Sequence, residues 1–193
     1  MNHPCAIVLG AGFGRRYAQA TGTDKLMAPC VGLDGIERPV LEQALLAFQD
    51  WAGERLLVVR KESQALQSLG ARYGFEVELI TTAGMGDSLS AAVRARPHAC
   101  GWLVALGDMP WVQPSTLAKV AAAMAPDRAC VPTYVGQWGH PVGFGARYGT
   151  ALTALSGDQG GRRLLREGPV YQVGVEDSGI LRDVDLPEDL IRA

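Results

Sequence analysis

The stretch that decides the fold is Cys5-Ala6-Ile7-Val8-Leu9-Gly10-Ala11-Gly12-Phe13-Gly14-Arg15-Arg16. Its first five residues are apolar, which predicts a parallel strand covered on both faces. The three glycines at alternate positions predict a tight turn, in which backbone N–H groups can approach an anion. Arg15, Arg16 and Lys25 place positive charge just beyond that turn. The stretch therefore favours a loop that holds a polyphosphate.

Two common nucleotide-binding loops do not fit this stretch. The dinucleotide pattern G-x-G-x-x-G requires glycine where Tyr17 stands, and no convincing acidic partner for a ribose follows it. The P-loop pattern G-x-x-x-x-G-K-[ST] is absent from the sequence. A glycine-rich turn that binds no ligand is the alternative that the loop alone leaves open.

Length and composition are those of a soluble globular protein. The 193 residues are enough for one domain whose core needs no disulfide or metal. A net charge of −2 gives no support for a nucleic-acid or membrane surface. No apolar run could span a bilayer and no signal peptide is recognisable, so we expect a cytoplasmic protein. The cysteines are far apart, which favours four reduced thiols over a zinc site or a disulfide: Cys5, Cys30, Cys100 and Cys130.

Strand-like and helix-like segments alternate through the first 134 residues. Buried strands are predicted at 5–9, 55–60, 76–81, 101–106 and 129–134, and helices at 39–48, 62–73, 84–95 and 114–125. We expect Asp87 or Ser88 to be the N-cap of the third of these helices. The alternation predicts an α/β fold with a Rossmann-like, mostly parallel sheet and helices on both faces.

The pattern changes after residue 135. Residues 137–145 predict a loop that enters a short strand, and two short helices are expected on either side of residues 157–162. A strand at 170–175 and a terminal helix from Pro187 complete the prediction. We expect a single domain, 1–193, in which residues 1–134 form the half with the phosphate-compatible loop and residues 135–193 form an elaboration with a second binding surface.

Asp108 directly follows the most strongly buried of the predicted strands. Ligands of open parallel sheets bind at the carboxyl ends of the strands, so we expect this carboxylate on the same rim as the glycine loop. An aspartate in this position can cap the following turn. It can also hold Mg²⁺, which takes one or two carboxylates together with phosphate oxygens. The phosphate-compatible loop favours the metal.

Other polar residues can serve a phosphoryl centre. A guanidinium such as Arg16 binds two phosphate oxygens at once, and an ammonium such as Lys25 is a compact charge that offsets charge on leaving pyrophosphate. Surface solvation is the ordinary alternative for both. His140, between glycine and proline, is either structural or a contact for a second substrate. Four residues near loops of the second half are either helix caps or a further metal ligand: Asp158, Arg162, Asp183 and Asp185.

Six motifs, in this order, resemble the MobA-like nucleotidyltransferases, and within them the molybdenum cofactor cytidylyltransferase branch. The resemblance covers nearly the whole chain. The motifs are Leu9-Gly10-Ala11-Gly12 with Arg16 and Lys25-Leu26-Met27-Ala28-Pro29, Gly84-Met85-Gly86-Asp87-Ser88-Leu89, Asp108-Met109-Pro110, Gly139-His140-Pro141-Val142, Gly157-Asp158-Gln159-Gly160, and Asp183-Val184-Asp185-Leu186-Pro187-Glu188-Asp189-Leu190.

The resemblance implies a fold of the nucleotide-diphospho-sugar transferase type. It also implies a transfer of CMP from CTP to the terminal phosphate of molybdopterin cofactor, with Mg²⁺ as cofactor and release of pyrophosphate. The implied partners are CTP, the molybdopterin cofactor, and a molybdoenzyme or its maturation chaperone. Neither nucleic acid nor a membrane is implied.

The resemblance also assigns roles to residues. Arg16, Lys25 and Asp108 would be catalytic, and Asp108 and Asp183 would bind the metal. His140 and Asp158 would bind the acceptor. The nucleotide would be bound by Leu9, Gly10, Ala11, Gly12, Gly14, Arg16, Lys25, Gly86 and Ser88.

The chain departs from the family pattern in the first loop. Gly10 and Gly14 stand where the family has alanine and serine, and the run from Arg16 to Lys25 is several residues longer. Ala11 stands where guanylyltransferase relatives favour glycine, which favours CTP. Three alternatives stay open: use of GTP, another acceptor such as a sugar or alcohol phosphate, and a non-catalytic maturation factor that binds the cofactor.

Overall fold

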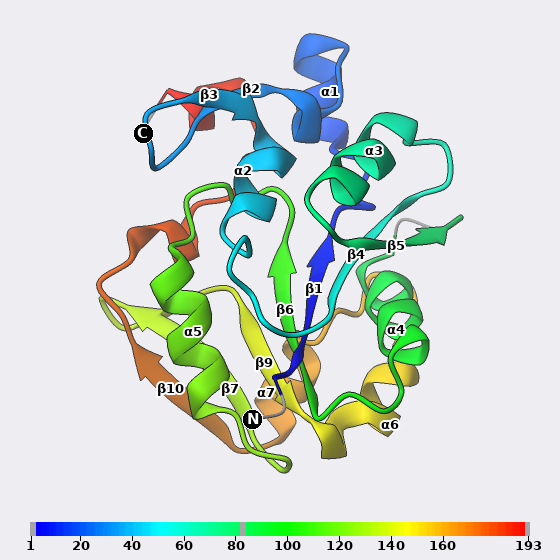
Figure 1. Cartoon of the computed structure of the whole chain (residues 1–193), viewed down its shortest axis with the longest axis vertical. Helices are drawn as coiled ribbons and strands as arrows, with labels where there is room; N and C mark the ends of the chain where they lie inside the picture. The colour runs from blue at the N-terminus through cyan, green and yellow to red at the C-terminus, as the bar shows by residue number, and fades with distance from the viewer. Residues whose placement is uncertain (1–2, 82–83, 192–193) are drawn as a thin grey trace.

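The computed structural model describes residues 3–81 and 84–191, and its centre is a mixed, mostly parallel sheet (Figure 1). The strand order is β10-β7-β9-β6-β1-β4-β5, and β8 pairs with β7. β9 runs antiparallel to both of its neighbours, and β8 is antiparallel to β7. The strands are β1 (Cys5–Leu9), β4 (Arg55–Arg60), β5 (Glu76–Ile80), β6 (Gly101–Leu106), β7 (Ala129–Tyr134), β8 (Gln137–Trp138), β9 (Val142–Gly145) and β10 (Val170–Gly174).

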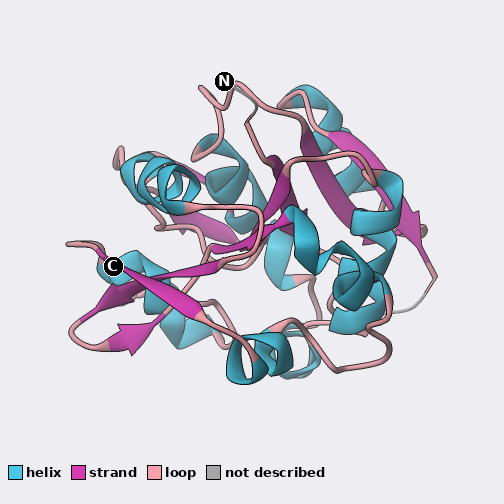
Figure 2. Cartoon of the chain, turned by 90° about the horizontal axis from the view of Figure 1, so that it is seen from below, coloured by secondary structure: helices cyan, strands magenta, loops and turns pink. Residues whose placement is uncertain are grey.

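Helices cover both faces of the sheet (Figure 2). One face packs on α2 (Val40–Leu46), α3 (Gln64–Arg72) and α5 (Pro114–Ala123), and the other on α4 (Met85–Ala95), α6 (Gly149–Thr153) and α7 (Arg162–Glu167). This confirms the predicted fold class. The remaining elements are α1 (Arg15–Thr21), the hairpin β2 (Pro29–Val31) and β3 (Glu37–Pro39), and the 3-10 helices η1 (Lys25–Met27), η2 (Ala146–Tyr148), η3 (Ser178–Leu181) and η4 (Pro187–Leu190).

β1 lies in the middle of the sheet because its side chains supply both cores. Ala6 and Val8 belong to the apolar cluster on one face, while Cys5 and Ile7 belong to the cluster on the other. Pairing of β1 with β4 and β6 ends at the same level, where Leu9 faces both Val58 and Leu106. The loops after β1 and β6 therefore leave the sheet side by side, at the end where α1 and the hairpin lie (Figure 1).

β9 comes from the second part of the chain but lies between β6 and β7. All four of its residues are buried. Its glycines are needed because neighbouring backbone is close: a Cβ on Gly145 would lie 1.9 Å from the carbonyl oxygen of Ala125. The peptide bond between His140 and Pro141, just before β9, is cis. The two predicted halves of the chain thus share one sheet.

Two of the predicted helix details are wrong. α4 begins at Met85 with Gly84 as its N-cap, not at Asp87 or Ser88. The Asp87 carboxylate instead accepts from the Gly157 amide at 3.0 Å, and the Ser88 hydroxyl donates to the Gly84 carbonyl at 2.9 Å. The terminal helix is only the single 3-10 turn η4.

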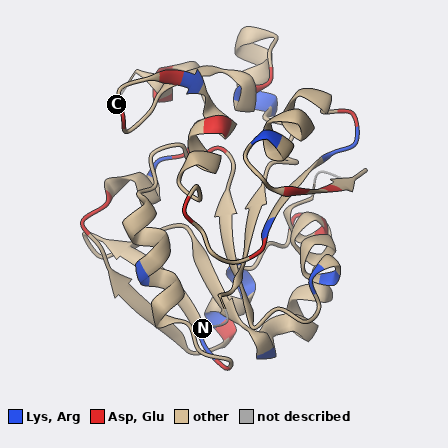
Figure 3. Ribbon diagram, in the orientation of Figure 1, with Lys and Arg blue, Asp and Glu red and all other residues tan. Residues whose placement is uncertain are grey.

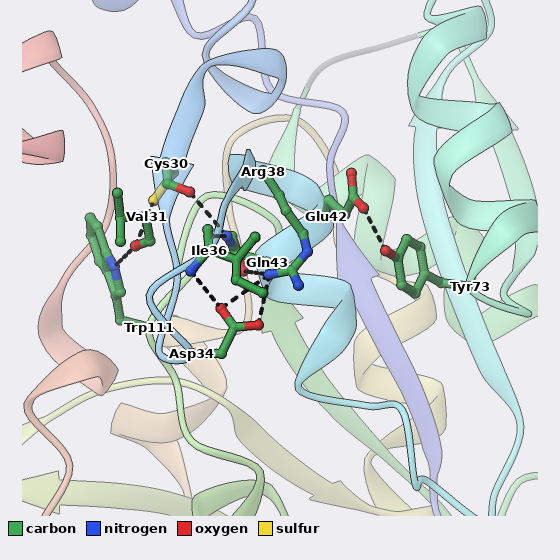
Figure 4. Close-up of polar contacts among 9 residues, drawn as sticks. All are labelled: Cys30, Val31, Asp34, Ile36, Arg38, Glu42, Gln43, Tyr73 and Trp111. Atoms are coloured by element: carbon green, nitrogen blue, oxygen red, sulfur yellow. Dashed lines mark hydrogen bonds and ion pairs between the residues drawn. The ribbon is translucent and has the colours of Figure 1, made fainter.

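The β2–β3 hairpin is held by side chains of the main body (Figure 4). The Gln43 amide on α2 donates to the carbonyls of Cys30 and Ile36, at 3.0 and 2.8 Å. The Trp111 indole donates to the carbonyl of Val31 at 3.0 Å. Because η1 leads directly into β2, these bonds also fix the segment that carries Lys25.

The cysteines differ in their exposure. Cys5, Cys30 and Cys130 are buried, whereas Cys100 is exposed. Within 3–81 and 84–191, no helix has the length and apolar character required to cross a membrane.

Candidate active site

The ammonium group of Lys25 joins two carboxylates at the carboxyl ends of the central strands. Its Nζ lies 2.6 Å from Oδ2 of Asp108 and 3.1 Å from Oδ1 of Asp185. Burial lowers the pKa of Lys25, but the two carboxylates outweigh this and leave its pKa above the ordinary value. Lys25 is therefore a permanent cation in a site that is largely shielded from water.

Asp185 also binds Arg16, so one carboxylate bridges the two predicted cations. The Arg16 guanidinium lies 2.6 Å from Oδ2 of Asp185 and is largely exposed. The segment around Asp185 is anchored because Val184 between the two aspartates is fully buried, and its amide donates to the Asp108 carbonyl at 2.9 Å. Positive and negative segments gather at this end of the molecule (Figure 3).

The glycine loop passes directly over this cluster. The Gly10 amide is committed to the Val58 carbonyl at 2.8 Å, so Gly10 contributes to the turn rather than an anion-binding amide. Gly14 has a left-handed backbone, with φ 55°, and a Cβ there would lie 3.1 Å from Cγ of Lys25. Gly12 has open space around it. The loop thus has open space at Gly12, where a ligand can bind, and it packs on Lys25 through Gly14.

Asp108 keeps one carboxylate oxygen without a hydrogen bond, which a hard cation could take as a ligand. Its Oδ2 binds Lys25, whereas its Oδ1 is buried with no hydrogen-bond partner. Burial, together with the negative charges of Asp185 and Asp108, raises the pKa of Asp183, although a bond to its own amide opposes this. In the described part of the chain, no group of three His, Cys, Asp or Glu side chains converges as a metal site. The residues fit an ion that takes one or two carboxylates and completes its shell with phosphate oxygens.

The segment predicted to read the base and a second loop, at Gly157 and Asp158, together line a small hollow of about 400 Å³. The Gly86 amide donates to the Gly157 carbonyl at 2.8 Å, which fixes the start of α4 against that loop. Phe13 and Gly14 of the glycine loop form the opposite wall. Ser88 is buried behind this surface and shapes it through its bond to Gly84.

A larger cavity, here called the acceptor cavity, has a volume of about 500 Å³. His140 and Asp158, the two predicted acceptor contacts, both line it, as does Leu9 at the end of β1. Burial lowers the pKa of His140, against opposing effects of a hydrogen bond to the Val104 backbone and the charge of Asp108. His140 is thus a neutral ring near Asp108. The cavity lining is Leu9, Met85, Leu89, Val104, Leu106, Val131, Trp138, Gly139, His140, Val142, Phe144, Asp158, Gly160, Gly161, Arg162 and Leu165.

Two further features of the site were not assigned from the sequence. Asp185, rather than Asp183, is the carboxylate that meets Lys25 and Arg16. Both aspartates belong to the same Asp-Val-Asp motif, and the sequence does not show which of them contacts the two cations. The ring of Phe13 also lies under two guanidinium groups, with centroid distances of 5.1 Å to Arg15 and 4.8 Å to Arg60.

Known proteins that resemble this chain include nucleotidyltransferases, a class of enzyme that fits a site for phosphate and a cation. The family model described as the MobA-like NTP transferase domain matches residues 6–173. The purine catabolism protein PucB of Bacillus subtilis is 31% identical to this chain, over 96% of the chain and 94% of that protein. Nicotine blue oxidoreductase of Paenarthrobacter nicotinovorans is 28% identical, over 98% and 96%.

The solved structures of Rv0371c from Mycobacterium tuberculosis are also similar. One has a TM-score of 0.81 at 27% identity, and the match covers 98% of this chain and 97% of that chain. A second, described as a complex with manganese, has a TM-score of 0.80 at 27% identity and covers 99% and 97%. A protein that shares this fold and is 27% identical to this chain is thus described with bound manganese.

Proposed function

We propose that this chain, which belongs to the MobA-like NTP transferase domain family and is a nucleotidyltransferase, transfers CMP from CTP to the terminal phosphate of molybdopterin cofactor. The observation that carries the proposal is the position of Lys25, packed on Gly14 of the loop and bonded to Asp108 and Asp185. Lys25 thereby connects a phosphate-compatible loop to Asp108, whose other carboxylate oxygen is buried and accepts no hydrogen bond.

The triphosphate of CTP would lie in the open space at Gly12, near the two cations. Arg16 is exposed and can turn toward phosphate oxygens, and Lys25 supplies a second positive charge from below. The acceptor phosphate oxygen attacks the α-phosphorus, the bond from that phosphorus to the β-phosphate bridging oxygen breaks, and pyrophosphate leaves. Because an ionised phosphate is already a nucleophile, no dedicated base is needed. These residues position the groups and offset the charge that develops on pyrophosphate.

Asp108 and Asp183 would hold Mg²⁺, which when bound neutralises phosphate charge. Oδ1 of Asp108 supports this role because it is buried and otherwise lacks a partner. Lys25 keeps Oδ2 of the same carboxylate in a fixed orientation. Asp185 would orient Arg16 and Lys25 rather than take part in the metal site.

Residues of both halves of the chain line each of the two hollows. In this proposal residues 1–134 would supply most of the nucleotide site, and residues 135–193 would supply His140 and Asp158 to the acceptor. Ala11 supports CTP as the nucleotide. Ala11 is buried in the same apolar cluster as Leu89 of α4, the helix whose first residues would help to read the base.

Pyrophosphate release tests the proposal. The purified protein is incubated with Mg²⁺ and either CTP or GTP, with and without molybdenum cofactor. We expect release with CTP that depends on the cofactor and is lost in Asp108→Asn, whereas Asp50→Asn, an exposed control, keeps it. Preference for GTP would make the protein a guanylyltransferase.

The other outcomes of this assay are also informative. Retention of nucleotide without pyrophosphate release would indicate a non-catalytic maturation factor. One relative is named an oxidoreductase, so NAD(P)H oxidation is measured in parallel. Oxidation without pyrophosphate release would contradict the proposed transfer.

A further inference from the structure

β10 is the last strand of the sheet, and within residues 3–81 and 84–191 one of its two edges has no partner strand. Its other edge pairs with β7, from Val170 opposite Ala129 to Gly174 opposite Thr133. Figure 1 shows β10 at the outer side of the sheet. An open strand edge presents a row of N–H and C=O groups that can pair with a further strand.

One hydrogen bond shows which backbone groups of β10 face that open edge. The amide of Val175, just past the end of β10, donates to the carbonyl of Thr133 on β7 at 3.0 Å. Backbone groups of successive strand residues point to opposite edges, so those of the residues two and four positions before Val175 also face β7. The N–H and C=O groups of the other three residues therefore face the open edge: Val170, Gln172 and Gly174.

β10 lacks the charges that commonly protect such an edge. Its sequence Val170-Tyr171-Gln172-Val173-Gly174 contains no charged residue and no proline, and its valines and tyrosine favour strands. The side chain of Tyr171 is 50% exposed. The strand at the opposite end of the sheet, β5, carries Glu76 and Glu78, and natural sheets use charges in this way to prevent edge pairing. The contrast indicates that the β10 edge is suited to a partner strand.

A second copy of β10 fits this edge in the antiparallel orientation. About a two-fold axis at Gln172, this residue faces its own copy, and Tyr171 faces Val173 of the partner subunit. The three residues with outward-facing backbone groups then form hydrogen-bonded pairs, in which each pair exchanges N–H···O bonds. An aromatic ring opposite a β-branched side chain is a favourable cross-strand pair, and the paired segment contains no like charges to repel.

We propose that this chain forms a two-fold dimer in which β10 pairs antiparallel with β10 of a second copy, so that the two sheets become continuous. The inference does not depend on the proposed function. β7 and β9 separate β10 from β6, so the interface lies away from Asp108 and Lys25. A strand of 5 residues makes a small interface, and we therefore expect a dissociation constant on the order of micromolar rather than nanomolar.

Sedimentation velocity of the full-length protein measures this association over roughly 1 to 300 μM. We expect the average mass to rise with concentration from that of a monomer towards that of a dimer, without larger species. A monomer at every concentration would overturn the inference and leave the edge to a strand of another protein.

Gln172→Pro tests the backbone bonds at the axis. The N–H of Gln172 faces the open edge, so proline removes no bond to β7, but the dimer loses both N–H···O bonds between the two copies of this residue. We expect the dissociation constant to rise on the order of tenfold or more.

Gln172→Lys is a second variant, which keeps the N–H and places like charges opposite each other, so it should also weaken association. Gln137→Lys on β8 is the matched control, because Gln137 is exposed but lies away from the open edge, and it should associate as the wild type does. Circular dichroism checks that each variant is folded. Unchanged association of a folded Gln172 variant would overturn the inference.

Disulfide formation tests the register, in a Cys100→Ser background because Cys100 is the exposed native thiol. Gln172→Cys places two thiols opposite each other, with Cα atoms about 5.5 Å apart, a distance that a disulfide spans. Oxidised glutathione accepts the two electrons and two protons and becomes two reduced molecules. Tyr171→Cys places the thiols diagonally, with Cα atoms about 7–8 Å apart, which is too far. We expect a covalent dimer of Gln172→Cys alone, and cross-linking of Tyr171→Cys instead would overturn the proposed pairing.

Discussion

Nζ of Lys25 lies 2.6 Å from Oδ2 of Asp108, although the two residues are 83 positions apart. One follows the glycine loop after β1, and the other follows β6. Their contact exists because β1 and β6 are paired in register and end together. The loop suited to phosphate and the carboxylate suited to a cation are thereby joined in one site.

Lys25→Met tests the cation in that contact. Methionine keeps most of the apolar stem but leaves Asp108 and Asp185 without their shared partner. Loss of one such charge contact is expected to reduce kcat by on the order of 10²–10³. Steady-state pyrophosphate release measures it, with Lys119→Met on the exposed face of α5 as the control. Near-normal turnover in folded Lys25→Met would remove Lys25 from the mechanism.

Asp108→Asn tests the divalent cation by a measurement that needs no substrate. A ligand that binds only the folded state raises the Tm with its concentration. We expect Mg²⁺ or Mn²⁺ to raise the Tm of the wild type and of Asp50→Asn, but not that of Asp108→Asn. An equal rise in all three proteins would place the cation elsewhere.

Ala11→Gly tests base selection. Ala11 is 2% exposed and belongs to the apolar cluster that also contains Leu89 of α4, so removal of its methyl group should loosen the packing of the loop near the segment proposed to read the base. We expect the ratio of kcat/KM for GTP to that for CTP to rise on the order of tenfold, the lower end of what one methylene group contributes in an apolar pocket. An unchanged ratio would show that base choice lies in other residues.

His140→Gln tests the effect of burial on that histidine. Burial lowers the pKa of His140, so the unfolded chain takes up a proton near its ordinary pKa while the folded chain does not. Folding stability is therefore present at neutral pH and falls as pH drops below about 6.5, by up to about 1.4 kcal/mol per pH unit. Urea unfolding at about pH 7.5 and 5.5 should show a smaller loss in His140→Gln than in the wild type.

The exposed His98→Gln variant is the control for that comparison, and it should lose stability as the wild type does. Identical pH dependence in all three proteins would contradict the buried, neutral state of His140.

Thiol labelling tests the packing of the core. Burial, with smaller effects of nearby charges, raises the pKa of Cys5 to about 12, and burial also raises the pKa values of Cys30 and Cys130. Thiolates react and thiols do not, so only the exposed Cys100 should react quickly in the native protein. A thiol reagent should count one fast group before unfolding and four after it. Rapid reaction of Cys5 in the folded protein would contradict the packing of β1.

Most strands and helices were predictable because short runs of neighbouring residues determine them. Apolar runs such as 5–9 and 101–106 are buried on both faces, and their ends are marked by glycine or aspartate. β9 was predicted as a short strand, but its place between β6 and β7 was not. Its position is set by backbone contacts to residues such as Ala125, which the sequence pattern does not show.

The site was predictable only where residues stand beside a strand end. Asp108 and the glycine loop meet this condition, and the structure brings them together. The side chain of Asp185 reaches Lys25 from 160 residues away, and the Asp-Val-Asp sequence alone does not show which of its two carboxylates makes this contact. The bond from the Gly157 amide to Asp87 joins residues 70 positions apart, so the local sequence shows only an aspartate near the start of a helix, which predicts a cap.

Isotope tracing tests the central claim most directly. The protein is incubated with Mg²⁺, molybdenum cofactor and CTP labelled either at the α-phosphate or at the γ-phosphate, and the products are separated. The proposed transfer predicts that α-label enters a cytosine dinucleotide of the cofactor and that γ-label appears in pyrophosphate, both lost in Asp108→Asn. Label that remains in CTP, or α-label that appears only as free CMP, would contradict transfer to this acceptor.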